Sequence, residues 1–302
     1  MNILLLGAGG QLGRALSTTL PALGTLTVLD RPQADFDDLD ALASQVRRHR
    51  PDLLVNAAAY TAVDQAEREP AAAQRVNAEA VAVLAAEARR AGALLLHYST
   101  DYVFDGAKPA PYVETDAAHP INVYGRSKLA GDCAVRDSGC RALVLRLSWV
   151  YSTAPGARHF VGTVLALART HDRLRMVADQ VGAPTSAERI AQVSAQAAAA
   201  CLAGRLAPGL YHLAAGGEVD RHALARHIVE RARRHGAALR LAPDAIEPAA
   251  TGDEPGRAPR PLNSRLDCTA LSRGLGITLP DWRADLDAAV DRLAAPDAQG
   301  PR

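Results

Sequence analysis

The chain has 302 residues, of which 48% are hydrophobic, and its 34 Lys and Arg residues nearly balance its 33 Asp and Glu residues. The net charge of +1 excludes a basic nucleic-acid-binding protein, and the hydrophobic content excludes a disordered chain. No apolar run approaches the roughly 20 residues of a transmembrane helix. The four cysteines lack the spacing of a zinc site. We therefore expect a soluble, cytoplasmic protein that binds no nucleic acid and no membrane.

The first half of the chain alternates short apolar segments with amphipathic ones. Strands are expected at residues 2–6, 26–29, 53–56, 94–98 and 142–147, and helices at 11–20, 39–48, 71–90 and 122–136. Apolar strands between amphipathic helices are typical of a parallel sheet that is covered on both faces. This pattern predicts a doubly wound α/β fold of the Rossmann type, with ligands at the carboxyl ends of the strands.

Beyond residue 150 the pattern is less regular. Helices are expected at 160–169, 188–202 and 221–234, a strand at 209–213, a polar loop at 179–186 and a proline-rich stretch of little regular structure at 242–261. We predict a dinucleotide-binding domain at residues 1–150, with about 186–206 packing back on it. Residues 151–302 would then form mainly a smaller, mixed substrate-binding lobe.

A glycine-rich segment lies between the first predicted strand and the first predicted helix. Gly7, Gly10 and Gly13 are spaced three residues apart. Glycines in this position allow a tight turn, the approach of a pyrophosphate and close packing of the helix on the strand. The free N–H groups at the start of the helix can then bind phosphate oxygens. The segment predicts a dinucleotide site.

Asp30 ends the second predicted strand, where a carboxylate can accept the ribose hydroxyls of NAD(H). Arg31 follows it and can instead bind the 2′-phosphate of NADP(H). The sequence therefore allows either NAD(H) or NADP(H) as the cofactor.

Tyr124 and Lys128 lie four residues apart, on one face of a predicted helix. A phenol with a pKa near 10 is a poor acid or base at neutral pH, and a neighbouring positive charge favours the phenolate. Lys128 is one of only two lysines in the chain, and it can also hold ribose hydroxyls. Ser99 and Thr100 follow the fourth strand, and alternation predicts that only one of them faces the site.

Together these motifs resemble the extended short-chain dehydrogenase/reductase family. The similarity is greatest to the branch of that family that reduces dTDP-linked 4-keto sugars. Its more specific segments are STDYVF at 99–104, SWVY at 148–151, DQVGAPT at 179–185 and RPLNSRL at 260–266.

The resemblance implies reduction of dTDP-4-dehydro-L-rhamnose to dTDP-L-rhamnose by NADPH or NADH. Tyr124 would donate the proton, with Lys128 as its partner and Thr100 bonded to the reacting oxygen. The cofactor would be lined by Gly7, Gly10, Gln11, Leu12, Gly13, Asp30, Asp35, Phe36, Ala59, Tyr60, Thr61, Tyr98, Tyr124 and Lys128. The substrate would contact Thr100, Asp101, Trp149, Arg260, Asn263 and Ser264.

The resemblance also leads to expectations about metal binding and oligomeric state. Some family members carry a magnesium-linked dimer built on a Glu in the first helix, but residues 13–16 read Gly-Arg-Ala-Leu here. We therefore expect no metal, and a monomer or homodimer.

Three other functions stay open at this point. The chain could reduce another 4-keto-6-deoxy sugar nucleotide, or it could be a nucleotide-sugar epimerase or dehydratase on the same fold. A dehydratase would carry a second acid after Thr100 and Asp101, where this chain has Tyr102. A non-catalytic dinucleotide-binding regulatory subunit is the third, and the intact set of Thr100, Tyr124 and Lys128 favours an enzyme over it.

Overall fold

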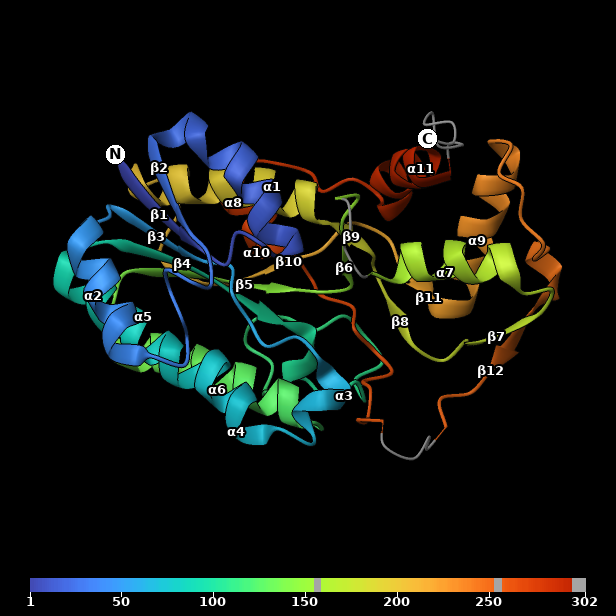
Figure 1. Cartoon of the computed structure of the whole chain (residues 1–302), viewed down its shortest axis with the longest axis horizontal. Helices are drawn as coiled ribbons and strands as arrows, with labels where there is room; N and C mark the ends of the chain where they lie inside the picture. The colour runs from blue at the N-terminus through green and yellow to red at the C-terminus, as the bar shows by residue number, and fades with distance from the viewer. Residues whose placement is uncertain (155–158, 253–256, 295–302) are drawn as a thin grey trace.

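The computed structural model describes residues 1–154, 159–252 and 257–294, which form a larger and a smaller lobe (Figure 1). The larger lobe is built on six parallel strands in the order β10-β5-β4-β3-β1-β2. The strands are β1 (Asn2–Leu6), β2 (Thr25–Leu29), β3 (Leu53–Asn56), β4 (Leu94–Thr100), β5 (Ala142–Leu147) and β10 (Gly209–Leu213). The doubly wound fold predicted from the alternation is confirmed.

Helices cover both faces of this sheet (Figure 1). One face is covered by α1 (Gln11–Thr19) and α8 (Ala187–Leu202), and the other by α2 (Leu39–His49), α5 (Ala80–Ala91) and α6 (Val123–Ser138). The helix expected at 71–90 is interrupted. It consists of α4 (Pro70–Gln74), a π-helical turn at Arg75–Glu79 and α5.

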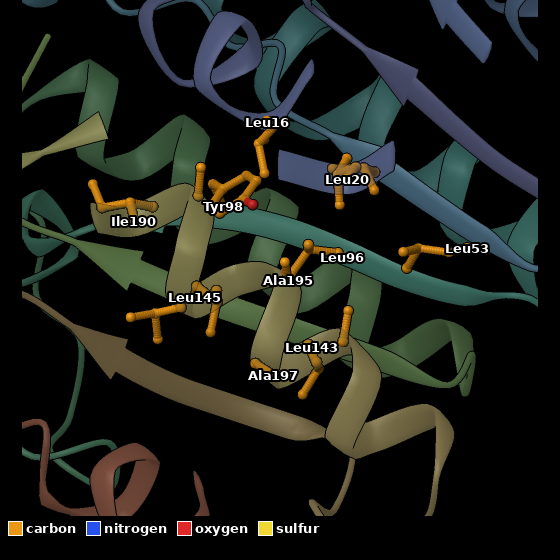
Figure 2. Packing of buried hydrophobic residues seen from close by; sticks show 14 of the residues in the cluster. Leu16, Leu20, Leu53, Leu96, Tyr98, Leu143, Leu145, Ile190, Ala195 and Ala197 are labelled. Carbon is orange, nitrogen blue, oxygen red and sulfur yellow. The ribbon is translucent and has the colours of Figure 1, made fainter. Parts of the chain in front are cut away.

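Side chains on α8 show why this helix can approach the sheet closely. Figure 2 shows Ala195 and Ala197 of α8 near Leu143 and Leu145 of β5, with Leu96 of β4 beside Ala195. All five belong to one buried hydrophobic cluster. Because alanine side chains are short, the helix backbone can lie near the sheet without leaving a void.

The order of the strands determines where a ligand can bind. The chain leaves β1 toward β2 on one side, whereas β3 pairs with β1 on the other side. The loops that follow β1 and β3 therefore diverge and leave a crevice at their carboxyl ends.

The smaller lobe packs three helices around Trp282, which is only 2% exposed. The helices are α7 (Phe160–Thr170), α9 (Arg221–Arg234) and α11 (Trp282–Ala294). The remaining short helices and strands, of which α3 and α10 pack on the larger lobe, are α3 (Val63–Ala66), β6 (Val150–Tyr151), β7 (Leu174–Val177), β8 (Val181–Gly182), β9 (Thr185–Ser186), β11 (Val219–Asp220), β12 (Ile246–Ala249) and α10 (Thr269–Leu275). No helix in the described ranges is long and apolar enough to cross a membrane.

Three segments differ from the expectations of the sequence. β12 pairs with β7 inside the stretch that was expected to lack regular structure, and the expected loop at 179–186 contains β8 and β9. β10 extends the main sheet although it lies beyond residue 150. The division at residue 150 stays a prediction, and parts of its second lobe, residues 155–158, 253–256 and 295–302, lie outside the described residues.

Candidate active site

A cleft of about 740 Å³ opens at the carboxyl ends of β1, β3 and β4. It brings together residues from loops that are far apart in the sequence. The residues predicted from the sequence that line it are Gly7, Gly10, Gln11, Leu12, Asp30, Ala59, Thr61, Tyr98, Thr100, Asp101, Tyr124, Lys128 and Trp149.

The glycine loop at one end of the cleft has a geometry that side chains would prevent. Gly7 has a φ of +79°, and a Cβ there would lie 2.5 Å from the backbone nitrogen of Ala58. A Cβ at Gly13 would lie 2.2 Å from the carbonyl oxygen of Gly7, so Gly13 serves the packing of α1 and is not part of the cleft lining. Gly10 caps α1, whose first turn carries no acidic residue. These features suit the pyrophosphate of a dinucleotide.

Asp30 and Arg31 both line the cleft beyond the glycine loop. The Arg31 side chain is 83% exposed and lies 3.5 Å from the Asp37 carboxylate. A ribose hydroxyl acceptor and a cation for a 2′-phosphate are therefore both available at this end.

Besides Gly13, three predicted cofactor residues are not part of the cleft lining. Phe36 is 8% exposed and packs in the hydrophobic core between the sheet and α2. The Asp35 carboxylate accepts the backbone N–H of Asp37 within its own turn. The Tyr60 hydroxyl donates to Glu69, 2.7 Å away. Each side chain is engaged by its own loop or core, which the spacing in the sequence does not reveal.

At the end of β4 the two hydroxyl residues have different partners. The Ser99 hydroxyl donates to the buried carboxylate of Asp132 at 2.8 Å, and Arg146 donates to the same oxygen. The Thr100 hydroxyl donates to Asp101 at 3.0 Å and accepts the backbone N–H of Tyr102. Thr100 is therefore the better candidate to contact a substrate oxygen.

Helix α6 places Tyr124 and Lys128 beside these residues. The helix begins after Asn122, whose side chain accepts the backbone N–H of Gly125 at 2.7 Å. A Cβ at Gly125 would lie 2.1 Å from the carbonyl oxygen of Tyr102, so glycine lets the helix start close to the end of β4. The Lys128 ammonium is buried and donates to the carbonyl of Tyr98 at 2.7 Å.

Burial controls the ionisation of these groups. It raises the pKa of Tyr124, an effect that the charge of Asp101 strengthens and the hydrogen bond with Thr100 opposes. The pKa of this phenol is therefore raised and not lowered as expected from the spacing with Lys128, and burial is the largest cause. Burial also lowers the pKa of Lys128 to about 8 and raises the pKa of Asp101 to about 6. At neutral pH Tyr124 carries the proton that an acid catalyst needs.

The far end of the cleft is formed by Trp149 and Arg221. Trp149 has a φ of +45°, a conformation that bulky residues rarely adopt outside functional sites. The guanidinium carbon of Arg221 lies 3.5 Å from the centroid of the Trp149 ring. Arg221 was not predicted from the sequence, because one arginine among many carries no signal without a motif.

The three substrate residues predicted in the RPLNSRL segment do not line the cleft, and they contact the loops around it. Arg260 pairs with Asp64 at 2.8 Å. The Asn263 amide donates to two backbone carbonyls, and the Ser264 carbonyl accepts the Ser148 hydroxyl at 2.9 Å. Their polar groups are used to hold loops together. Within the described ranges, no three His, Cys, Asp or Glu residues cluster as metal ligands.

The parallel sheet, the glycine loop and the Tyr124–Lys128 pair at one cleft define a short-chain dehydrogenase/reductase fold of the extended type. Residues 1–295 match the model of the RmlD substrate binding domain family, and the chain belongs to that family. A dTDP-4-dehydrorhamnose reductase from Burkholderia thailandensis is 46% identical over 97% of this chain and 99% of its own length.

Solved structures agree with this assignment. A dTDP-4-dehydrorhamnose reductase from Clostridium acetobutylicum superposes with a TM-score of 0.87 at 31% identity, covering 97% of this chain and 99% of its own. The enzyme of the same name from Bacillus anthracis, solved in complex with NADP, has a TM-score of 0.84 at 29% identity. That comparison covers 96% of this chain and 97% of the other.

Proposed function

We propose that this protein reduces the 4-keto group of dTDP-4-dehydro-L-rhamnose to give dTDP-L-rhamnose, with NADPH or NADH as reductant. The observation that carries the proposal is the meeting of Thr100, Tyr124 and Lys128 in the cleft that the glycine loop enters. The names of the relatives support the substrate. The proposal describes a cytoplasmic monomer or homodimer that acts on a dTDP-sugar and binds no nucleic acid.

The site residues fit a nicotinamide dinucleotide. A side chain at Gly7 would clash with the backbone of Ala58, and the first turn of α1 is free of acidic groups. When bound, the reduced nicotinamide supplies a hydride to the keto carbon. The NADP of the Bacillus anthracis enzyme supports NADPH, and Asp30 leaves NADH as a second reductant.

In this proposal the protein supplies the proton and the electrostatic environment. Tyr124 donates its phenolic proton to the oxygen of the keto group as negative charge develops there. Because burial keeps the pKa of Tyr124 high, the phenol is protonated before each turnover. The Thr100 hydroxyl, which donates to Asp101 in this structure, turns to donate its hydrogen bond to the same oxygen when the substrate binds. The Lys128 ammonium stabilises the developing negative charge.

The proposal is tested by following NADPH and NADH oxidation at 340 nm. The keto sugar is generated from dTDP-glucose by a 4,6-dehydratase and a 3,5-epimerase. Turnover that requires both helper enzymes is the expected result. Turnover without the epimerase would move the substrate to the D-series keto sugar, and no turnover in either mixture would contradict the proposal.

A further inference from the structure

Arg221 is a cleft residue to which the proposed reaction assigns no role. It is the first residue of α9 and reaches from the smaller lobe into the cleft. Its guanidinium carbon lies 3.5 Å from the ring centroid of Trp149 and 4.8 Å from that of Phe160. Two aromatic rings thus hold the planar group in place through cation–π contacts.

The hydrogen-bond donors of this guanidinium are unused. Its side chain makes no hydrogen bond or ion pair with any residue in the described part of the chain. Two neighbouring arginines differ, because Arg260 pairs with Asp64 and Arg265 with Glu218. None of the Arg221 nitrogens is among the fully buried polar atoms, so the donors reach the open cleft.

The charges around Arg221 do not neutralise it. Asp101 and Tyr102 act on it from the end of β4, and the positive charge of Arg260 opposes them. One oxygen of the Asp101 carboxylate accepts the Thr100 hydroxyl and the other has no hydrogen-bond partner among the described residues, so Asp101 acts on Arg221 through space without forming an ion pair with it. A cation that is only partly exposed and has no ion-pair partner is costly to a fold, and it is commonly retained where a ligand supplies the anion.

We propose that Arg221 binds the diphosphate of the nucleotide sugar and that Trp149 positions its guanidinium by stacking. The identity of the ligand rests on the proposed function. A guanidinium presents a rigid fork of donors that matches two phosphate oxygens at once. The ring face of Trp149 that Arg221 covers then serves the cation, and the predicted contact of Trp149 with the deoxysugar stays a prediction.

Trp149 is itself fixed by its surroundings. A Cβ at Gly182 would lie 2.7 to 3.0 Å from three atoms of the indole, so the backbone of β8 packs directly on the ring. The indole therefore cannot shift toward Gly182, which keeps the Arg221 guanidinium at one place in the cleft. This makes Trp149 a positioning residue in the proposal.

Calorimetric titration of thymidine, dTDP and dTDP-L-rhamnose tests this role. Arg221→Gln is expected to bind dTDP about 10- to 100-fold more weakly, the usual effect of losing a charge-assisted hydrogen bond, with thymidine unchanged. Arg221→Lys keeps the positive charge but lacks the forked donors, so its affinity for dTDP should lie between those of the wild type and Arg221→Gln. The control is Arg226→Gln, which removes an exposed charge from the same helix away from the cleft and should bind dTDP like the wild type.

Trp149→Leu tests the stacking. It should weaken dTDP binding when Arg221 is present and add little in the Arg221→Gln background, because the two residues act as a unit. An equal loss from Trp149→Leu in both backgrounds would overturn the positioning role.

The other outcomes separate this inference from the proposed function. If Arg221→Gln weakens dTDP-L-rhamnose but not dTDP, the arginine contacts the sugar and the diphosphate assignment is wrong. Equal affinity of Arg221→Gln and wild type for both ligands overturns the inference while leaving the proposed function intact. If the wild-type protein binds NADPH but not dTDP, the proposed function itself fails. NADPH affinity also reports that each variant is folded.

Discussion

Asp101, Tyr124 and Lys128 are buried ionisable groups at one end of the cleft, and burial shifts the pKa of each toward its neutral form. The pKa of Asp101 is raised to about 6 and that of Lys128 is lowered to about 8. Between these values the carboxylate and the ammonium are charged while the phenol keeps its proton. The proposed chemistry needs this combination of charges.

We predict that kcat/KM for the keto sugar falls on both sides of this window. Below about pH 6 Asp101 gains a proton and no longer holds the Thr100 hydroxyl as a charged acceptor. Above about pH 8 Lys128 loses the proton that makes it a cation. A pH–rate profile at saturating cofactor, which reports such groups, should be bell-shaped with limbs near these values.

Asp101→Asn provides the control for the acidic limb. The amide is uncharged at every pH, as protonated Asp101 is, and it does not titrate. The variant should lose the decline below about pH 6 and keep the decline above about pH 8. An acidic limb that persists unchanged in Asp101→Asn would show that another group is responsible.

Some residues of the site could be predicted from the sequence, and others are found only in the structure. Tyr124 and Lys128 could be predicted because their spacing on a helix is itself the motif. Arg221 could not, because it enters the cleft through the packing of the smaller lobe, far along the chain from the motifs. Asn263 shows the converse. It lies in a specific segment, yet its amide is bonded to the carbonyls of Lys108 and Ala110.

At the scale of elements, two glycines three residues apart at the start of α1 have different roles, one in packing and one in binding. Gly13 lies against the backbone of Gly7 and Ala8, with no room for a Cβ. A Cβ at Gly10 would lie 3.4 Å from the Gly7 carbonyl oxygen, which is an ordinary contact. The two positions therefore separate the stability of the loop from cofactor binding.

We predict that Gly13→Ala lowers the free energy of unfolding by about 1–3 kcal/mol or more, because overpacking forces α1 away from the loop. Gly10→Ala should retain wild-type stability but bind NADPH about tenfold more weakly, since its methyl group meets the approaching pyrophosphate. Thermal unfolding and fluorescence titration with NADPH measure the two effects. Similar losses of stability in both variants would contradict this division of roles.

Strands could be predicted from the sequence where the run of apolar residues was several residues long. The bounds 2–6, 53–56, 142–147 and 209–213 match the observed strands, because buried apolar runs are bounded by turn residues. The two-residue strands β8 and β9 carry no periodicity to detect. β12 contains Pro248, which argues against a strand in sequence yet is tolerated in this two-stranded pair.

At the scale of the whole molecule, an ion pair joins the two lobes. Arg189 of α8 donates two hydrogen bonds to Asp285 of α11, at 3.0 and 2.9 Å. The Ser186 hydroxyl donates to the same carboxylate. α8 covers the main sheet and α11 belongs to the core around Trp282, so this contact fixes the smaller lobe beside the cleft.

Asp285→Ala is expected to raise the KM for the sugar nucleotide several-fold while leaving NADPH affinity unchanged, because only the substrate side of the cleft is loosened. The side chains are partly exposed, so the loss of stability should be about 1 kcal/mol. Asp172→Ala removes an exposed pair with Arg240 and serves as the control, with unchanged KM and Tm. A parallel loss of NADPH affinity in Asp285→Ala would contradict the predicted selectivity.

The measurement that tests the central claim most directly is the kcat of Tyr124→Phe on the in situ keto sugar. The variant removes only the proton donor, so kcat should fall at least about a hundredfold, the usual scale for a positioned general acid. NADPH affinity and Tm should stay at their wild-type values. A folded variant that keeps more than about a tenth of the wild-type kcat would contradict the account, since that loss is too small for a general acid.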